Sequence, residues 1–307
     1  MSSAAPNRGD TTQRHRMRVT LLHNKSAGSE NHARADLKEK LRRGGHALVD
    51  AVSDVEALLV SLADRSCDLV VVAGGDGTVS RAACALADRN LPLAILPLGT
   101  ANNTARSLGV QGDVDALIAG WAAGTYRTLD LATINEGDRL SAFSEAVGWG
   151  IFPKVIKKTD ALPSPERREH TLERDRSAFT SVIERAKPHF YDIDVDGERV
   201  AGDFLLVEVV NIPFIGPQLQ LSPDSNPSDG TFEVVLAGED DRAALLELAT
   251  NGRIASAARL ATHSARRLTV RSEMRCFHHD GDVVEATHKP NISAIAIKPA
   301  SVTYLLS

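Results

Sequence analysis

The chain has 307 residues, 43% of them hydrophobic, and a formal net charge of −5, a length that suits two domains better than one. The small acidic excess argues against a nucleic-acid partner, and no apolar run approaches the roughly 20 residues that cross a bilayer. The cysteines Cys67, Cys84 and Cys276 lie far apart without CxxC spacing, which predicts buried thiols in a reducing compartment.

The first 16 residues carry basic side chains with no apolar segment behind them. We therefore expect a solvated, disordered tail and no secretory signal. The alternative is weak contact of Arg8, Arg14, Arg16 and Arg18 with anionic lipid, although stable anchoring usually needs more charge or a lipid group.

Residues 17–127 alternate between apolar, strand-like runs and segments with helical periodicity. Short connections between such elements predict a parallel sheet with helices on both faces. Ligands of these sheets bind beyond the carboxyl ends of the strands. The predicted strands are 18–24, 46–52, 68–75 and 91–99, and the predicted helices are 33–45, 54–64, 78–90 and a segment from 101 onward.

Three loops follow strands at this sheet edge: HNKSAGS (23–29), GGDGT (74–78) and PLGTANN (97–103). Glycine lets the backbone approach a ligand, and the N–H groups that begin the next helix attract an anion. One such turn also occurs in proteins without a ligand, but three on one edge favour a phosphate site. The glycines and hydroxyl donors involved are Gly74, Gly75, Gly77, Ser26, Thr78 and Thr100.

Asp76, in the middle of the second loop, would repel a phosphate unless a cation lies between them or a proton is handled there. The loops lack the GxxxxGK[ST] pattern of a P-loop. They also lack a convincing GxGxxG with an acidic residue about 20 positions later, so a Rossmann dinucleotide site is not indicated.

Beyond residue 127 the alternation gives way to strand-like segments separated by Gly, Asp, Asn and Pro, with helices near 151–187 and 240–261. This pattern predicts an antiparallel β-sandwich over 128–307, and leaves open a return of the last residues to the first domain. Asp196-Gly197 predicts a hairpin turn without a chemical role. The charged segment 159–188 predicts an exposed helix, with an interfacial lid carrying Arg167, Arg168, Arg174 and Arg176 as the alternative.

The segment CFHHDGDVVEA (276–286) places two histidines beside two aspartates. Neighbouring side chains on a strand point to opposite faces, so His278 and His279 are not expected to share a metal ion. The simplest interpretation of Asp280-Gly281 is a hairpin turn.

GGDGT followed by PLGTANN resembles the diacylglycerol kinase catalytic-domain family, which includes bacterial soluble lipid kinases, sphingosine kinases and ceramide kinases. GGDGT alone also occurs in the distantly related NAD kinases. HNKSAG is similar to the family's NPxSG loop, with Lys25 in place of proline. SPDSNPSDGTFEVVL (222–236) resembles its P-x-A-x-x-x-DG-x-L-D-V segment, and HHDGD lies where the family carries DGE, with Asp282 in place of glutamate. The resemblance covers residues 17–307.

This resemblance implies an α/β N-terminal domain like that of NAD and diacylglycerol kinases, and a C-terminal β-sandwich domain that takes the lipid. It implies ATP and Mg²⁺ in the cleft, with Asp76 as the partner of the Mg²⁺, and Asp280 as the base that accepts the proton of a lipid hydroxyl. It further implies a structural Mg²⁺ held by the Asp229 carboxylate and carbonyls of Asn226 and Thr231, for which a plain turn is the alternative. The implied nucleotide-binding residues are Asn24, Ser26, Gly74, Gly75, Asp76, Gly77, Thr78, Gly99, Thr100, Asn102 and Asp282.

The family also implies that segments 148–156 and 211–221 border the lipid pocket, whereas Trp149 and Phe214 could equally be ordinary core or loop residues. We therefore predict a cytoplasmic ATP-dependent lipid kinase of lipid metabolism that meets its substrate at a membrane surface, for example diacylglycerol or a sphingoid base. The alternatives are an NAD kinase-like enzyme acting on a soluble nucleotide and a non-catalytic nucleotide-binding protein. Homodimer formation stays open.

Overall fold

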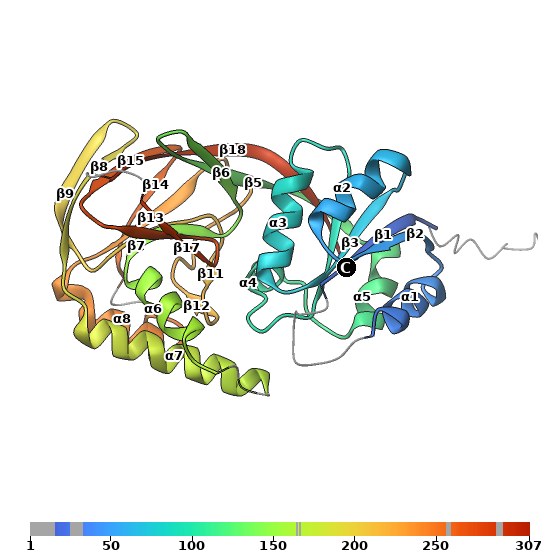
Figure 1. Ribbon diagram of the computed structural model, residues 1–307, viewed down its shortest axis with the longest axis horizontal. Coiled ribbons are helices and arrows are strands. Elements are labelled where there is room, and N and C mark those ends of the chain that lie inside the picture. The colour runs from blue at the N-terminus through green and yellow to red at the C-terminus, as the bar shows by residue number, and fades with distance from the viewer. Residues whose placement is uncertain (1–15, 25–32, 164, 166, 256–258, 287–290) are drawn as a thin grey trace, which may run out of the picture.

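A computed structural model describes residues 16–24, 33–163, 165, 167–255, 259–286 and 291–307. The expected tail (1–15) and the residues Lys25 and Ser26 lie outside the described residues. The chain folds into two lobes connected by long strands (Figure 1). We call β1–β4 with α1–α5 the N-terminal lobe, and β6–β17 with α6–α8 the C-terminal lobe.

The N-terminal lobe contains a parallel sheet with the strand order β2-β1-β3-β4. Its strands are apolar, and every residue of β3 is buried, which explains the run LVVVAG. The strands are β1 (Arg18–His23), β2 (Ala47–Val52), β3 (Leu69–Gly74) and β4 (Leu93–Pro97). The helices are α1 (Arg34–Arg43), α2 (Val55–Asp64), α3 (Asp76–Leu86), α4 (Asn103–Ser107) and α5 (Val114–Gly120), followed by a 3₁₀ turn, η1 (Trp121–Ala123).

Two helices of this lobe differ from the sequence prediction in ways that have a clear physical reason. Helix α3 begins at Asp76 instead of residue 78, because Gly75 caps it in an extended conformation and an acidic first turn complements the helix dipole. Helix α5 was not predicted; Asp113 caps it by accepting the Ala116 N–H at 3.0 Å.

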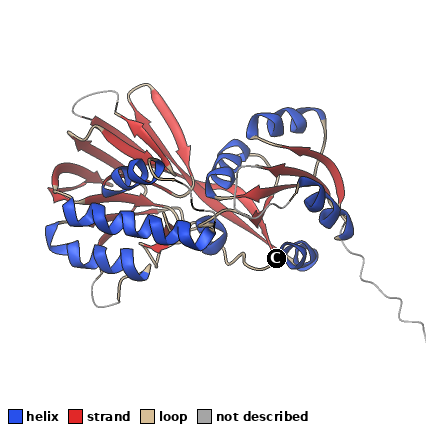
Figure 2. Cartoon of the chain, turned by 60° about the horizontal axis from the view of Figure 1, so that its bottom comes forward, coloured by secondary structure: helices blue, strands red, loops and turns tan. Residues whose placement is uncertain are grey.

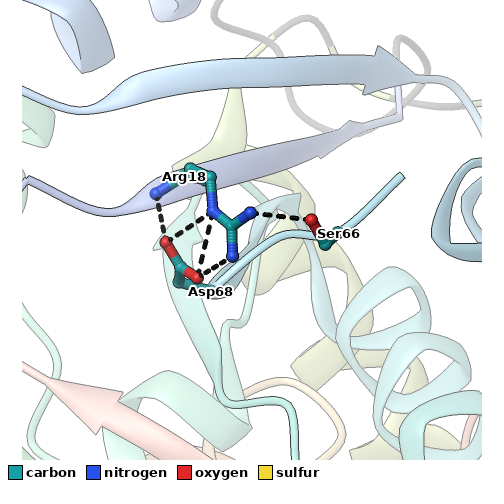
Figure 3. Close-up of polar contacts among 3 residues, drawn as sticks. All are labelled: Arg18, Ser66 and Asp68. Atoms are coloured by element: carbon teal, nitrogen blue, oxygen red, sulfur yellow. Dashed lines mark hydrogen bonds and ion pairs between the residues drawn. The ribbon is translucent and has the colours of Figure 1, made fainter.

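An ion pair secures the start of β1 (Figure 3). The Arg18 guanidinium donates to both oxygens of Asp68, with Nη2 2.7 Å from Oδ1, and to the Ser66 hydroxyl at 2.7 Å. The backbone N–H of Arg18 donates to Asp68 as well. Arg18 therefore holds β1 against the segment that leads into β3, and its charge is already paired.

The described strands of the C-terminal lobe build a sandwich of two antiparallel layers. One layer is a six-stranded sheet with the order β14-β13-β10-β7-β16-β17. The other is formed by β9, β8, β15, β18, β5 and β6, as part of a larger sheet. Apolar side chains fill the space between the layers, including Phe143, Trp149 and Tyr191, which are fully buried. Trp149 is therefore a core residue.

The strands and helices of this half follow in chain order. They are β5 (Thr125–Glu136), β6 (Arg139–Phe143), β7 (Ala146–Gly150), α6 (Ile151–Asp160), α7 (Arg168–Arg185), β8 (His189–Val195), β9 (Glu198–Phe204), β10 (Leu206–Val210), β11 (Phe214–Ile215), β12 (Leu219–Gln220), β13 (Phe232–Ala237), η2 (Glu239–Asp241), α8 (Arg242–Asn251), β14 (Ala261–Ala265), β15 (Arg267–Ser272), β16 (Cys276–His279), β17 (Asp282–Glu285) and β18 (Asn291–Leu306).

Helices α6, α7 and α8 cover the outer face of the six-stranded sheet, and Figure 2 shows α7 and α8 side by side along it. Helix α7 is charged, as its sequence predicts, yet Phe179 and Ile183 are fully buried against that face. Two of the arginines assigned to the alternative lid have partners within the protein. Arg174 pairs with Asp175, and Arg176 donates to the Pro217 carbonyl.

Strands β5 and β18 run through both lobes. They pair from Thr125 with Leu306 to Glu136 with Ser293, and the end of β18 lies parallel to β4, with Tyr304 opposite Leu93. The sequence prediction of an α/β domain with a parallel sheet followed by an antiparallel β domain is confirmed. The exact division at residue 127 stays a prediction.

Two smaller expectations can be compared with the structure. Asp196-Gly197 forms the two-residue turn between β8 and β9, and both residues have positive φ, as this hairpin type requires. The three cysteines are free thiols, but each is only partly buried, so the expectation of buried thiols is wrong. None of the helices in the described part of the chain has the length and apolarity needed to span a bilayer.

Candidate active site

The GGDGT and PLGTANN loops meet through their backbones. A Cβ added to Gly99 would clash with the Gly75 Cα, and it would lie 3.1 Å from the Gly75 nitrogen and 2.8 Å from the Asn102 Oδ1. Cβ atoms do not tolerate such distances to backbone atoms, so this crossing requires glycine. The ends of β3 and β4 are thereby held together at the carboxyl edge of the sheet.

Asn102 fixes the second loop from within. Its backbone has φ 51°, in the left-handed region, and its side chain accepts the Gly99 N–H at 2.9 Å and donates to the Gly99 carbonyl at 2.9 Å. Asparagine is one of the few residues other than glycine that adopt this conformation readily. Asn102 therefore shapes the loop through hydrogen bonds that occupy its side chain.

Asn24, which follows β1, contacts the GGDGT turn: its Nδ2 donates to the Thr78 Oγ1 at 3.1 Å. Gly77 is exposed in the first turn of α3, where the N–H groups of Asp76 and Gly77 have no carbonyl of the helix to bond, whereas the Thr78 N–H donates to the Gly75 carbonyl at 3.0 Å. The nearest atoms to a Cβ at Gly77 belong to the Arg81 guanidinium, at 3.8 Å and 3.9 Å. Free N–H groups and a nearby cation make this turn suitable for an anion.

The Asp76 side chain is directed toward α4. Its Oδ1 accepts the Thr104 N–H at 3.2 Å, and the N–H groups of Asn102 and Asn103 and the Glu145 side chain also bond to it. Burial raises the pKa of Asp76, and the hydrogen bonds from Thr104 and its neighbours oppose that rise. Asp76 of the GGDGT loop is thus hydrogen-bonded to the end of the PLGTANN loop and the start of α4.

Asp280 lies at the tip of the β16–β17 hairpin with φ 50°. Its carboxylate accepts the N–H groups of Ser144 at 3.2 Å, Glu145 at 2.9 Å and Ala146 at 3.1 Å, and it also accepts the hydroxyl of Ser80. Ser80 belongs to α3, the helix that begins at Asp76. The structure therefore brings Asp280 of the C-terminal lobe beside the GGDGT helix of the N-terminal lobe, and Asp280 is both a turn residue and a site candidate.

Other parts of the 276–286 segment lie elsewhere. His278 is buried and contacts Glu208, with 2.5 Å between Nε2 and Oε1, whereas His279 packs edge-on against Phe143 between the two sheets. The two histidines therefore face opposite sides of β16, as expected. Asp282 is exposed at the start of β17.

Sequence reasoning missed Glu145. Its side chain is 6% exposed, accepts the Thr104 hydroxyl at 3.0 Å and hydrogen-bonds to Asp76. Burial and the adjacent carboxylates of Asp76 and Asp280 raise the pKa of Glu145 well above its usual range. The residue carries no motif, but a glutamate inside the otherwise apolar run AFSEAVGWG (142–150) was a signal that could have found it.

The segment after β10 contacts the PLGTANN loop. Asn103 Nδ2 donates to the Gly216 carbonyl at 2.9 Å, and Gln218 Nε2 donates to the Ala101 carbonyl at 3.0 Å. The Arg106 guanidinium lies 5.5 Å from the centre of the Phe214 ring. Part of the segment expected to border a lipid thus lies directly against a loop expected to bind nucleotide.

The turn proposed to hold a structural metal is closed by hydrogen bonds. Asp229 Oδ1 accepts both the N–H and the hydroxyl of Thr231, at 3.0 Å and 2.8 Å. The Asn226 Oδ1 accepts from Arg127 Nη2 at 2.8 Å, and the Asn226 carbonyl accepts the Ser228 N–H. The Asp229 Oδ1 and the Asn226 carbonyl already accept hydrogen bonds, and a metal ion at this turn stays a prediction to which we assign no reaction step.

Within the described residues, no group of three His, Cys, Asp or Glu side chains is arranged to hold a metal ion. Asp76 is the carboxylate nearest the predicted phosphate turn, and its contacts are with backbone N–H groups and Glu145. If an Mg²⁺ is bound together with a triphosphate, Asp76 is the described carboxylate that would hold it.

Comparison with known proteins adds two family matches. Residues 18–134 match the diacylglycerol kinase catalytic domain, and residues 165–305 match the YegS C-terminal NAD kinase beta sandwich-like domain. Together the two segments take in most of the chain.

Individual relatives agree with these matches. A diacylglycerol kinase of Mycobacterium tuberculosis (strain H37Rv) is 29% identical over 220 residues, which are 68% of this chain and 69% of the relative. A diacylglycerol kinase of Bacillus subtilis is 26% identical over 250 residues, 76% of this chain and 78% of the relative.

Solved structures share the fold. The crystal structure of a diacylglycerol kinase from Bacillus anthracis superposes with a TM-score of 0.69 at 19% identity, and the match covers 94% of this chain and 97% of that one. A second crystal structure from the same organism has a TM-score of 0.73 at 20% identity, covering 97% and 98%.

Proposed function

Because the chain belongs to the diacylglycerol kinase catalytic-domain family, we propose that it transfers the γ-phosphate of ATP to a hydroxyl of a lipid such as diacylglycerol or a sphingoid base. The observation that carries the proposal is the contact between Asp280 and Ser80. It places an acidic side chain of the C-terminal lobe beside the helix whose glycine-rich start is suited to phosphate.

In this proposal ATP lies along the GGDGT and PLGTANN loops, with its phosphates at the exposed first turn of α3. Asn24 donates to Thr78, and Gly99 allows the GGDGT and PLGTANN loops to stay in contact. An Mg²⁺ bound with the triphosphate would be held by Asp76 and would neutralise part of the phosphate charge. Arg81, whose guanidinium lies near Gly77, adds a positive charge at the same turn.

The acceptor is a lipid hydroxyl that comes from the side of the C-terminal lobe. Its oxygen attacks the γ-phosphorus, its proton passes to Asp280, and the bond between the γ-phosphorus and the bridging oxygen breaks to release ADP. Three backbone N–H groups and Ser80 hold the Asp280 carboxylate in one orientation. Catalysis then comes mainly from positioning and charge neutralisation, as in other phosphoryl transfers.

The test is incubation of the protein with labelled ATP, Mg²⁺ and a panel of hydroxylated lipids, followed by organic extraction and mass spectrometry. We expect label in the organic phase with wild type, and its loss with Asp280→Asn. The exposed Asp203→Asn on strand β9 serves as the matched control and should retain turnover.

Two outcomes would contradict the proposal. Label on NADP in the aqueous phase of a parallel reaction that contains NAD would favour an NAD kinase-like activity, and ATP binding without transfer to any acceptor would favour a non-catalytic role. Near-normal turnover of Asp280→Asn would remove Asp280 from its role as base.

A further inference from the structure

Glu145 lies between β6 and β7 and contacts four segments that are far apart in the sequence. Its side chain accepts the Thr104 hydroxyl at 3.0 Å and hydrogen-bonds to Asp76, so it reaches both glycine-rich loops of the N-terminal lobe. Its backbone N–H donates to Asp280 at 2.9 Å, and its carbonyl accepts the Asn211 N–H at 2.8 Å. One residue thus connects the phosphate loops, the candidate base and the loop after β10.

The carboxyl groups of Asp76, Glu145 and Asp280 are neighbours at this site. Their contacts in the described part of the chain are with hydroxyls, backbone N–H groups and one another. Glu145 is the most buried of the three.

The Glu145 side chain has two hydrogen-bond partners. Its Oε1 accepts from the Thr104 hydroxyl, and the carboxyl group also hydrogen-bonds to the Asp76 side chain. Glutamine would reproduce this arrangement, with its carbonyl oxygen facing Thr104 and its amide N–H facing Asp76. Alanine would remove both bonds, and aspartate would be one methylene too short to make both.

We propose that Glu145 is a positioning residue of the transfer reaction, because its buried side chain fixes the phosphate loops relative to the strand end whose N–H groups hold Asp280. This inference rests on the proposed function. The backbone of residues 144–146 supplies all three N–H groups that bind Asp280, so a shift of that segment moves the base. A misplacement of about 1 Å between reacting groups costs roughly 100-fold in rate.

The decisive experiment compares kcat and the KM for ATP of Glu145→Gln, Glu145→Ala and Glu145→Asp. We expect Glu145→Gln to keep kcat within about threefold of wild type, because it retains both hydrogen bonds, and the other two variants to lose roughly 100-fold in kcat. KM for ATP should change by less than about threefold in all three, because Glu145 bonds to the Asp76 side chain and the Thr104 hydroxyl and not to the N–H groups that begin α3. Glu233→Ala, which removes a half-buried glutamate of β13, is the matched control and should leave kcat unchanged.

A milder variant covers the case in which Glu145→Ala fails to fold. Thr104→Val removes only the hydroxyl that donates to Glu145 and keeps the shape of the side chain and the backbone N–H that binds Asp76. Thr104→Val should lower kcat by a smaller factor than Glu145→Ala does. When Thr104→Val is added to Glu145→Ala, the further loss of kcat should be smaller than the loss that Thr104→Val causes in wild type.

Hydrogen exchange gives a readout that does not depend on turnover. The N–H groups of residues 144–146 should be protected in wild type and Glu145→Gln, and should exchange at least tenfold faster in Glu145→Ala. Absence of transfer by the wild type would contradict the proposed function while leaving this readout to test Glu145. An active wild type with Glu145→Ala equally active, or with Glu145→Gln as impaired as Glu145→Ala, would overturn the inference.

Discussion

Gly77→Ala separates folding from phosphate binding in the GGDGT loop. Gly77 is the second residue of α3, and an added Cβ would meet only the Arg81 guanidinium, at 3.8 Å and 3.9 Å, which is ordinary contact with a flexible side chain. Its backbone is not in the left-handed region. Alanine has the higher helix propensity, so the variant should gain up to about 1 kcal/mol in the free energy of unfolding.

The same methyl group lies where a phosphate would approach the exposed first turn. Loss of one charged hydrogen bond between an N–H group and a phosphate oxygen costs about 1.5–3 kcal/mol, which corresponds to a roughly 10- to 100-fold rise in the KM for ATP. The expected result is thus a protein that is at least as stable as wild type and binds nucleotide poorly.

Urea unfolding and the KM for ATP measure the two effects separately. Gly238→Ala is the control, because its Cβ would also make only ordinary contacts, the nearest being the Asp203 carbonyl at 3.7 Å, and it precedes η2 in the C-terminal lobe. A folded Gly77→Ala with an unchanged KM for ATP would refute phosphate binding at this turn. A strongly destabilised variant would refute the steric argument.

Three further predictions concern stability and reactivity. Gly148→Ala should lower the free energy of unfolding by about 1–3 kcal/mol, because a Cβ on β7 would lie 2.5 Å from the Glu208 Cδ and 2.8 Å from the Val207 carbonyl oxygen; an unchanged urea midpoint would contradict this packing. Asp54→Ala removes the cap that accepts the Ala57 N–H at 2.8 Å and should cost about 1 kcal/mol in thermal unfolding, whereas Asp54→Asn should cost less. Burial raises the pKa of the Cys84 thiol to about 12 from 9.0, so its thiolate is about a thousandfold rarer at pH 8 than in the unfolded chain. Iodoacetamide should therefore label Cys84 only after unfolding, and equal labelling of the native protein, read by mass spectrometry, would argue against its burial.

Local sequence patterns determined the elements of the fold. The apolar run of β3 predicts a buried strand, and in the structure every residue of this strand is buried. Asp196-Gly197 predicts a hairpin turn because Asp and Gly tolerate the positive φ that both turn positions adopt. The GGDGT loop was placed correctly at a strand end, although α3 begins two residues earlier than predicted. Helix α5 was missed because seven residues are too few for a clear periodic signal.

Only the tertiary structure decided how the site is assembled. Asp280 and Ser80 are 200 positions apart, and their contact depends on the path of β5 and β18 between the lobes. The requirement for glycine at Gly99 comes from the Gly75 backbone, which local propensity does not describe. Glu145 lies in a segment that reads as an ordinary strand, and its partners come from both lobes. Such contacts follow from the packing of segments that are far apart in the sequence, so the local sequence pattern around one residue does not predict its partner.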